Sequence, residues 1–127
     1  MQDKHLFEYA AIRVVPRVER EEFFNAGVIL YCRSRRFLAL KITLSREKAL
    51  LFCPEEDLQQ LEDNLRAFEL VCSGGKDGGP IAELDAASRF RWLTATRSTV
   101  IQTSKVHPGF CDDPADTLQH LFTQLVI

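Results

Sequence analysis

The feature that most constrains the fold is a succession of three strand-like segments in the first third of the chain. Each segment is rich in β-branched, aromatic or other apolar residues, and short charged connections, 16–21 and 33–36, separate them. Strands joined by connections this short pair in antiparallel fashion. The sequence therefore predicts an antiparallel meander over residues 5–44. Its strands are residues 6–15, 22–32 and 37–44.

The segment that follows has the features of helices. Ser45 is a candidate N-cap for a short helix that ends near Phe52, and Pro54 opens a second helix with acidic residues in its first turn. In the second helix, apolar residues recur at spacings of three and four, which is typical of an amphipathic helix. Residues 45–72 are therefore predicted to be helical. The apolar positions are Leu58, Leu61, Leu65 and Phe68.

The last third of the chain combines a loop, a strand and a helix. Residues 73–80 are rich in glycine and are predicted to form a flexible loop. Within residues 81–127 we expect helical structure at first and then a fourth strand over 99–106. The remaining elements are a turn at His107, Pro108 and Gly109 and a closing helix over 114–126 with Asp113 as its N-cap.

These elements fit into one domain. The chain has 127 residues, of which 46% are hydrophobic and 27% are charged, and these are ordinary values for a globular protein. At about 150 residues per domain the length corresponds to a single domain, and no linker long enough to divide the chain is present. The predicted fold class is α+β: an antiparallel sheet of about four strands with helices packed against one or both faces.

Charge is distributed unevenly along the chain. The net charge is −2, from 16 Lys and Arg against 18 Asp and Glu. Residues 1–50 carry ten basic and six acidic side chains, whereas residues 51–127 carry six basic and twelve acidic ones. This excludes a polycation that coats nucleic acid in bulk, but it allows a basic surface on the sheet and an acidic one on the helices. Solvated helix faces are the simpler explanation of the acidic half.

The sequence also indicates a cytoplasmic location. No apolar run approaches the roughly 20 residues that cross a bilayer, and the first residues lack the layout of a signal peptide. The cysteines lie far apart, form no C-x-x-C pair and have apolar neighbours, so we expect buried thiols. Because His107, Cys111 and Asp112 match no common zinc spacing, neither a metal nor another cofactor is predicted. The cysteines are Cys32, Cys53, Cys72 and Cys111.

The strand faces provide the candidate binding residues. Because side chains alternate along a strand, one face of the meander is predicted to collect aromatic, small and hydrogen-bonding side chains. Half-buried polar groups need partners, which a ligand can supply. The alternative is that helices cover this face and that Arg13 pairs with Glu8 or Glu22. The face consists of Tyr9, Arg13, Asn25, Gly27, Tyr31 and Lys41, joined by Gln102 and Ser104 from the fourth strand.

An anion is the ligand that these residues favour. Arg13 offers a planar fork that suits a carboxylate or phosphate, and Arg20 is a second cation nearby. In this interpretation Asn25 orients the ligand and Gly27 permits a close approach. No strong general base accompanies them, which weighs against hydrolysis, and whether the protein is an enzyme stays open. The pocket is completed by Gln102 or Ser104, with Lys41 on the same face.

Nucleic acid is not an expected partner. The arginines fall into two groups at opposite ends of the second predicted strand, so they need not form one patch. Glutamates interleave with the first group, and no RNA-binding aromatic signature is present. The groups are Arg13, Arg17 and Arg20, and Arg33, Arg35 and Arg36.

Two N-terminal motifs resemble a known bacterial family. Tyr9-Ala-Ala-Ile-Arg-Val-Val-Pro16 is followed by Arg20-Glu-Glu-Phe-Phe-Asn-Ala-Gly-Val-Ile-Leu30. The chain resembles the family known as domain of unknown function 3037, whose members carry a Tyr-x-x-x-Arg-x-x-Pro strand and an Asn-x-Gly-Val-x-Leu strand. Phe24 and Ala26 flank Asn25 where relatives often have Val, which is a mild departure. The likeness continues through residues 92–102, Pro114 and the Leu118-x-x-Leu121-Phe122 helix.

The resemblance implies a small bacterial protein without an assigned chemistry. Relatives are often encoded beside a protein with a kinase-like toxin-type domain, which implies a partner or a target of regulation. The first functional hypothesis is therefore a non-enzymatic interaction or regulatory module whose partner is another protein, with a homo-oligomer as a further expectation. The alternative is a protein that binds a small anionic ligand, or an enzyme that acts on one, through the arginine-bearing sheet face.

Overall fold

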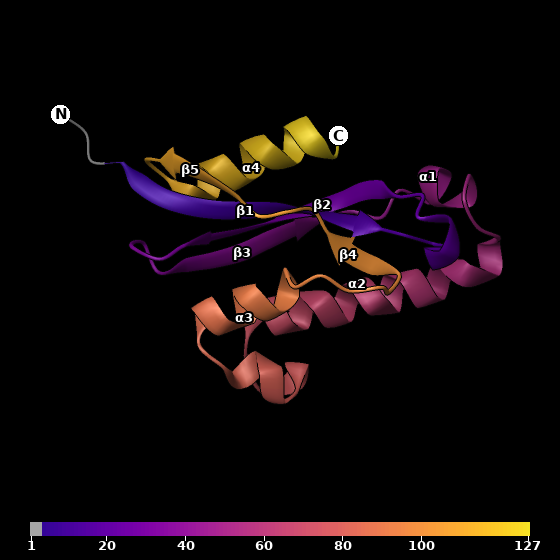
Figure 1. The fold of residues 1–127 in the computed structure, drawn as a ribbon, viewed down its shortest axis with the longest axis horizontal. Coiled ribbons are helices and arrows are strands. Elements are labelled where there is room, and N and C mark those ends of the chain that lie inside the picture. The colour runs from indigo at the N-terminus through magenta and orange to yellow at the C-terminus, as the bar shows by residue number, and fades with distance from the viewer. Residues whose placement is uncertain (1–3) are drawn as a thin grey trace.

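The computed structural model describes residues 4–127, which fold into a five-stranded antiparallel sheet with helices on both faces (Figure 1). The strands are β1 (His5–Val14), β2 (Phe24–Cys32), β3 (Phe37–Ile42), β4 (Ile101–Thr103) and β5 (His107–Cys111). Their order is β3-β2-β1-β4, and β5 pairs with β1 as well. The predicted meander and the α+β fold class are confirmed, because β1, β2 and β3 pair in sequence order.

The helices begin where the sequence places their caps. The Ser45 hydroxyl accepts a hydrogen bond from the Lys48 amide at 3.2 Å, and the Asp113 carboxylate accepts one from the Ala115 amide at 3.0 Å. Both predicted N-caps are therefore confirmed. The helices are α1 (Arg46–Leu50), α2 (Leu58–Ser73), α3 (Ala86–Leu93) and α4 (Pro114–Leu125), with 3-10 turns η1 (Val18–Arg20), η2 (Glu55–Asp57), η3 (Lys76–Gly78) and η4 (Pro80–Glu83).

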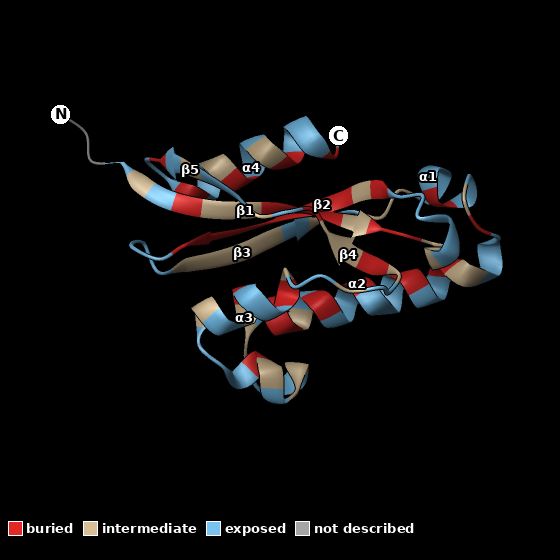
Figure 2. Ribbon diagram, in the orientation of Figure 1, coloured by how far each residue is buried: buried red, intermediate tan, exposed pale blue. Residues whose placement is uncertain are grey.

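The central strands β1 and β2 carry buried side chains on both faces of the sheet, and red bands mark these residues (Figure 2). One face packs against α2 and α3, and the opposite face packs against α4. We call these the α2/α3 face and the α4 face. Strand residues on the α2/α3 face include Ala10, Ile12, Val14, Ile29 and Tyr31. Strand residues on the α4 face include Phe7, Val28, Leu30, Cys32 and Cys111.

A β-bulge in β2 changes which side chains share a face. Ile12 lies opposite Gly27, but Arg13 lies opposite Asn25, so Ala26 is an extra residue in β2. A single extra residue reverses the alternation that follows it. The strict alternation assumed for β2 was therefore wrong: Gly27 lies on the α2/α3 face. Tyr31 lies there too, and its ring is 5.4 Å from that of Phe90 on α3.

The segment around Pro108 is a strand, and its interpretation as a turn was wrong. β5 pairs with β1 from His5 opposite Cys111 to Tyr9 opposite His107. A proline is tolerated here because β5 is an edge strand. Gly109 is required by packing, since a Cβ atom at that position would lie 2.6 Å from the Phe7 ring.

The glycine-rich segment, predicted to be a flexible loop, is folded against α2. The Gly74 amide donates to the Leu70 carbonyl at 3.1 Å, and the Gly75 amide donates to the Ala82 carbonyl at 3.0 Å. A Cβ atom at Gly78 would lie 2.4 Å from the Cβ of Ala82 and 2.9 Å from the Leu70 carbonyl oxygen. Gly78 is therefore needed for the close approach of this segment to α2, and this contact fixes the position of η3.

All four cysteines are buried free thiols, as expected from their apolar neighbours. Burial raises the pKa of the Cys72 thiol to about 12. Among residues 4–127, no helix has the length and apolar character needed to cross a membrane.

Candidate functional site

Three of the predicted site residues form one row across the sheet. Arg13 on β1 lies opposite Asn25 on β2 and, at its other side, opposite Gln102 on β4. Residues directly opposite each other in a sheet project from the same face. Since Ile12 and Val14 belong to the α2/α3 core, the row of Arg13, Asn25 and Gln102 projects from the α4 face.

Arg13 has no carboxylate partner among the described residues. Its guanidinium carbon lies 4.1 Å from the centre of the Phe23 ring, and its Nε atom is buried without a hydrogen-bond partner. The alternative considered for Arg13, a pair with Glu8 or Glu22, was wrong, because other arginines bind those two carboxylates. Glu8 accepts from Arg91 at 3.0 and 3.1 Å, and Glu22 accepts from Arg20 at 2.6 Å.

Asn25 connects the row to the end of α4. Its Nδ2 atom donates to the Leu125 carbonyl at 3.0 Å, which satisfies one of the free carbonyls at the C-terminus of that helix. Its Oδ1 atom is buried and has no partner. The neighbouring positions Arg13 and Asn25 therefore hold one unfilled donor and one unfilled acceptor on the same face of the sheet.

Two cavities of about 180 and 300 Å³ lie beside this row. Both are lined by Arg13, Thr96, Arg97 and Gln102, and we call the two together the arginine cleft. The Gln102 side chain is held by its hydrogen bond to the Thr99 carbonyl at 2.9 Å. The cleft is completed by Val15, Val18, Glu21, Phe23, Thr94, Ala95, Ser98, Thr103, Ser104 and Lys105.

The arginine cleft has an excess of positive charge. Three cations line it, namely Arg13, Arg97 and Lys105, against the single carboxylate of Glu21. None of the three cations forms an ion pair within 4.0 Å among the residues that the structure describes. Partial burial lowers the pKa of Arg97, because burial penalises its charged form. The cleft therefore carries more positive than negative charge.

The other predicted site residues lie in places that explain them structurally. The guanidinium of Arg20 is exposed, and its hydrogen bond to Glu22 raises its pKa. Gly27 admits β3, since a Cβ atom there would lie 2.4 Å from the Lys41 carbonyl oxygen. The Lys41 ammonium group donates to Gln119 on α4 and lies 5.5 Å from the Phe122 ring. Neither Arg20, Gly27 nor Lys41 lines the arginine cleft.

Ser104 fills a defect between β4 and β5. β4 pairs with β1 as far as Thr103 opposite Ile12, and β5 pairs with β1 from His107 opposite Tyr9. The segment that joins β4 to β5 is therefore one residue longer than the part of β1 that it faces. The buried Ser104 hydroxyl accepts from the Ala11 amide at 2.9 Å and donates to the Lys105 carbonyl at 2.9 Å. It thus replaces a missing backbone partner, and it also borders the arginine cleft.

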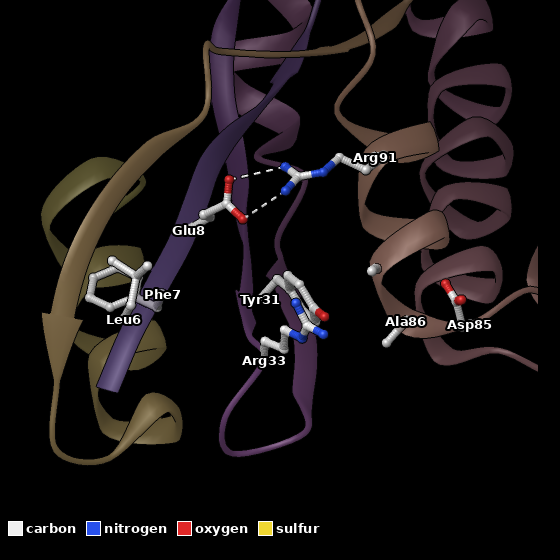
Figure 3. A pocket seen from close by; sticks show the side chains of 9 residues that line it. Leu6, Phe7, Glu8, Tyr31, Arg33, Asp85, Ala86 and Arg91 are labelled. Atoms are coloured by element: carbon white, nitrogen blue, oxygen red, sulfur yellow. Dashed lines mark hydrogen bonds and ion pairs between the residues drawn. The ribbon is translucent and has the colours of Figure 1, made fainter. Parts of the chain in front are cut away.

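A larger cavity, of about 590 Å³, lies at the opposite end of the sheet between β1, β2 and α3 (Figure 3). Glu8 and Arg91 face each other across it and form two hydrogen bonds, so the charges of these two residues neutralise each other. This pair could not be predicted from the sequence, because 83 residues separate its members. Its walls are otherwise formed by Leu6, Phe7, Tyr31, Arg33, Asp85, Ala86 and Ala87.

Residues 4–127 contain no cluster of side chains that could bind a metal ion. No group of three or more His, Cys, Asp or Glu side chains there is placed to hold an ion. The three cations of the arginine cleft instead suit oxygen atoms that carry negative charge.

Comparisons with known proteins identify a family. No curated protein sequence and no solved structure matches the chain. A family model described as "Protein of unknown function (DUF3037)" matches residues 9–126, which include the row of Arg13, Asn25 and Gln102 as well as α4. This match covers nearly the whole chain and agrees with the resemblance of the two N-terminal motifs. The chain therefore belongs to the DUF3037 family of proteins of unknown function.

Proposed function

We propose that the protein binds a small anion, of the phosphate or carboxylate class, in the arginine cleft. The observation that carries this proposal is the environment of Arg13, whose Nε atom is buried without a partner and whose guanidinium has no carboxylate within 4.0 Å among the described residues. A buried donor without a partner is costly, so the Arg13 Nε–H group is expected to have an acceptor when the protein acts. An anion supplies both the counter-charge and the missing acceptor.

The surroundings of Arg13 support binding rather than turnover. The guanidinium packs on the Phe23 ring, which also lines the cleft, and this contact reduces the side-chain entropy that is lost when an oxyanion binds. Lys105 adds positive charge, and the hydroxyls of Thr96 and Ser98 add donors. No histidine or cysteine lines the cleft in the described part of the chain, and its one carboxylate, Glu21, is exposed.

Isothermal titration calorimetry with inorganic phosphate tests the proposal, and a parallel titration with acetate separates phosphate from carboxylate preference. Arg13→Gln removes the charge but keeps a polar side chain. We expect it to weaken binding by about 10-fold or more, the factor expected for one charge-assisted hydrogen bond. Arg35→Gln is the matched control, since Arg35 is exposed in the connection between β2 and β3. Equal affinities of the two variants, or no binding by the wild type, would contradict the proposal.

A second candidate function, an interaction module for another protein, is favoured by a separate observation. Leu6 on β1 lies opposite Phe110 on β5, and these side chains are 55% and 70% exposed. β5 pairs only with β1, so its outer edge is open among the described residues. Open edges with exposed apolar side chains favour pairing with a further strand. The family resemblance adds a kinase-like toxin-type protein as a partner to test.

A pull-down from cells that co-express the neighbouring gene product tests this second function. We expect Phe110→Ser to lose the partner, whereas Leu51→Ser, which changes a side chain that is 82% exposed, retains it. Light scattering of the purified protein separates a homo-oligomer from a hetero-complex. Retention of the partner by Phe110→Ser would contradict a role for the β5 edge.

A further inference from the structure

A further cavity, of about 380 Å³, opens on the side of β4 opposite the arginine cleft. Ile101 lines it, and this side chain belongs to the α2/α3 core, whereas the next residue, Gln102, points into the arginine cleft. We call it the Trp92 cavity. Its other lining residues are Asn64, Ala67, Phe68, Leu70, Val71, Asp77, Gly78, Trp92, Arg97 and Thr99.

The walls of the Trp92 cavity are apolar and partly aromatic. Phe68, Val71 and Ile101 form its inner side and are buried in the core. Trp92, at the end of α3, is 42% exposed and offers aromatic surface to the cavity. The volume lies within the range of small-molecule sites. A planar aromatic group matches both the size and the surface of this cavity.

Arg97 supplies a fixed cation at the same cavity. Its guanidinium carbon lies 4.5 Å from the centre of the Trp92 ring, and the group donates to the carbonyls of Trp92 and, at 3.3 Å, Ala95. These contacts hold the charge in place without neutralising it, because no carboxylate lies within 4.0 Å of it in the described structure. Partial burial, which lowers its pKa, makes a counter-ion favourable.

Asp77 limits how much negative charge the ligand can carry. It lies on η3, whose position is fixed by the close contact of Gly78 with α2, and it lines the Trp92 cavity from the side of the glycine-rich segment. Asp77 and Arg97 form no ion pair with each other. A ligand with two or more negative charges would meet the repulsion of Asp77, whereas a single carboxylate can pair with Arg97.

We propose that the Trp92 cavity binds a planar aromatic monocarboxylate, with its ring against Trp92 and the apolar wall and its carboxylate on Arg97. This site is separate from the arginine cleft, which it meets only at Arg97 and the connection that follows α3. The proposal therefore does not depend on anion binding at Arg13, and each can fail without the other.

Calorimetric titration with three probes of one shape tests the ligand class. The probes are 2-naphthoate, the neutral 2-naphthamide and the cationic 2-naphthylmethylamine. We expect 2-naphthoate to bind and the other two to bind at least about 10-fold more weakly, because only the carboxylate pairs with Arg97. Tighter binding of the amine, or equal binding of all three, would overturn the proposal. The chain has a single tryptophan, so its one indole N–H resonance should shift during the naphthoate titration.

Variants locate the binding without disturbing the core. Ala67 is exposed on α2 and lines the cavity, so Ala67→Phe fills the space and should abolish naphthoate binding. Gln60→Phe is the matched control, since Gln60 is exposed on the same helix outside the cavity. Unchanged naphthoate affinity in Ala67→Phe would overturn the proposal. A naphthoate affinity lost in Arg13→Gln would also overturn it, by assigning the probe to the arginine cleft.

Discussion

Arg13 and Asn25 lie directly opposite each other on β1 and β2, and each holds a buried polar atom without a partner. The atoms are complementary, since the Arg13 Nε–H group is a donor and Asn25 Oδ1 is an acceptor. Buried polar groups in folded proteins are nearly always satisfied. An anion in the arginine cleft, which Arg13 lines and Asn25 does not, would supply the acceptor that the Arg13 Nε–H group lacks.

A carboxylate placed in the row should compete with the anion. Gln102→Glu puts a negative charge opposite Arg13, so we expect phosphate affinity to fall at least about 10-fold while the free energy of unfolding changes by less than about 1 kcal/mol. Calorimetry and urea denaturation measure the two effects. Gln60→Glu makes the same charge change on exposed α2 and should leave phosphate binding unaltered. Equal losses in both variants would indicate a general effect of charge.

Replacement of Ser104 by alanine should destabilise the fold. The change leaves the buried Ala11 amide without its acceptor at the defect between β4 and β5. An unsatisfied buried donor costs about 1–3 kcal/mol, which urea denaturation can measure. Ser98→Ala, at an exposed position of the connection before β4, should have little effect. A Ser104→Ala variant as stable as the wild type would show that the hydroxyl is replaceable.

Gly27→Ala should be destabilising for a steric reason. The added Cβ atom would lie 2.4 Å from the Lys41 carbonyl oxygen, which is backbone and cannot rotate away. Overpacking of this kind costs about 1–3 kcal/mol, so we expect a lower thermal midpoint and weakened pairing of β2 with β3. Ligand affinity at the arginine cleft should survive in the folded fraction. A thermal midpoint equal to that of the wild type would contradict this prediction, because it would show that β3 can move away from the added Cβ atom at no cost in stability.

Stability should fall at alkaline pH through Cys72. Burial raises its thiol pKa to about 12 in the folded protein, whereas an unfolded chain has the ordinary value near 8.5. The unfolded state therefore releases this proton first, so the contribution is complete below about pH 8.5 and is lost as pH rises toward 12. The loss approaches about 1.4 kcal/mol per pH unit. Denaturation of Cys72→Ala between pH 8 and 11 should show a shallower slope than the wild type, and identical slopes would contradict this assignment.

The meander and the caps could be predicted because their signals are local. Short charged connections and apolar segments specify β1 to β3, and Ser45 and Asp113 carry the side-chain oxygens that cap α1 and α4. The bulge at Ala26 could not be predicted from alternation. β2 is apolar on both faces, so its sequence does not show where the phase reverses.

The remainder of the site depends on distant contacts. Pro108 and Gly109 are typical turn residues, and only pairing with β1 and contact with Phe7 make them a strand. Arg13 and Gln102 could be placed on one face from the sequence, but Arg97 reaches the cleft through a connection whose course follows from the packing of α3. That Arg97 has no carboxylate partner among the described residues likewise follows from the folded structure and not from the local sequence.

The most direct test of the central claim is the Arg13 Nε–H resonance, observed by NMR during a titration with inorganic phosphate. If the arginine cleft binds the anion, this resonance should shift and saturate with the dissociation constant measured by calorimetry. The Arg35 resonance, from an exposed arginine outside the cleft, should stay in place. An Arg13 resonance that does not move while calorimetry shows saturable binding would contradict the assignment of the site.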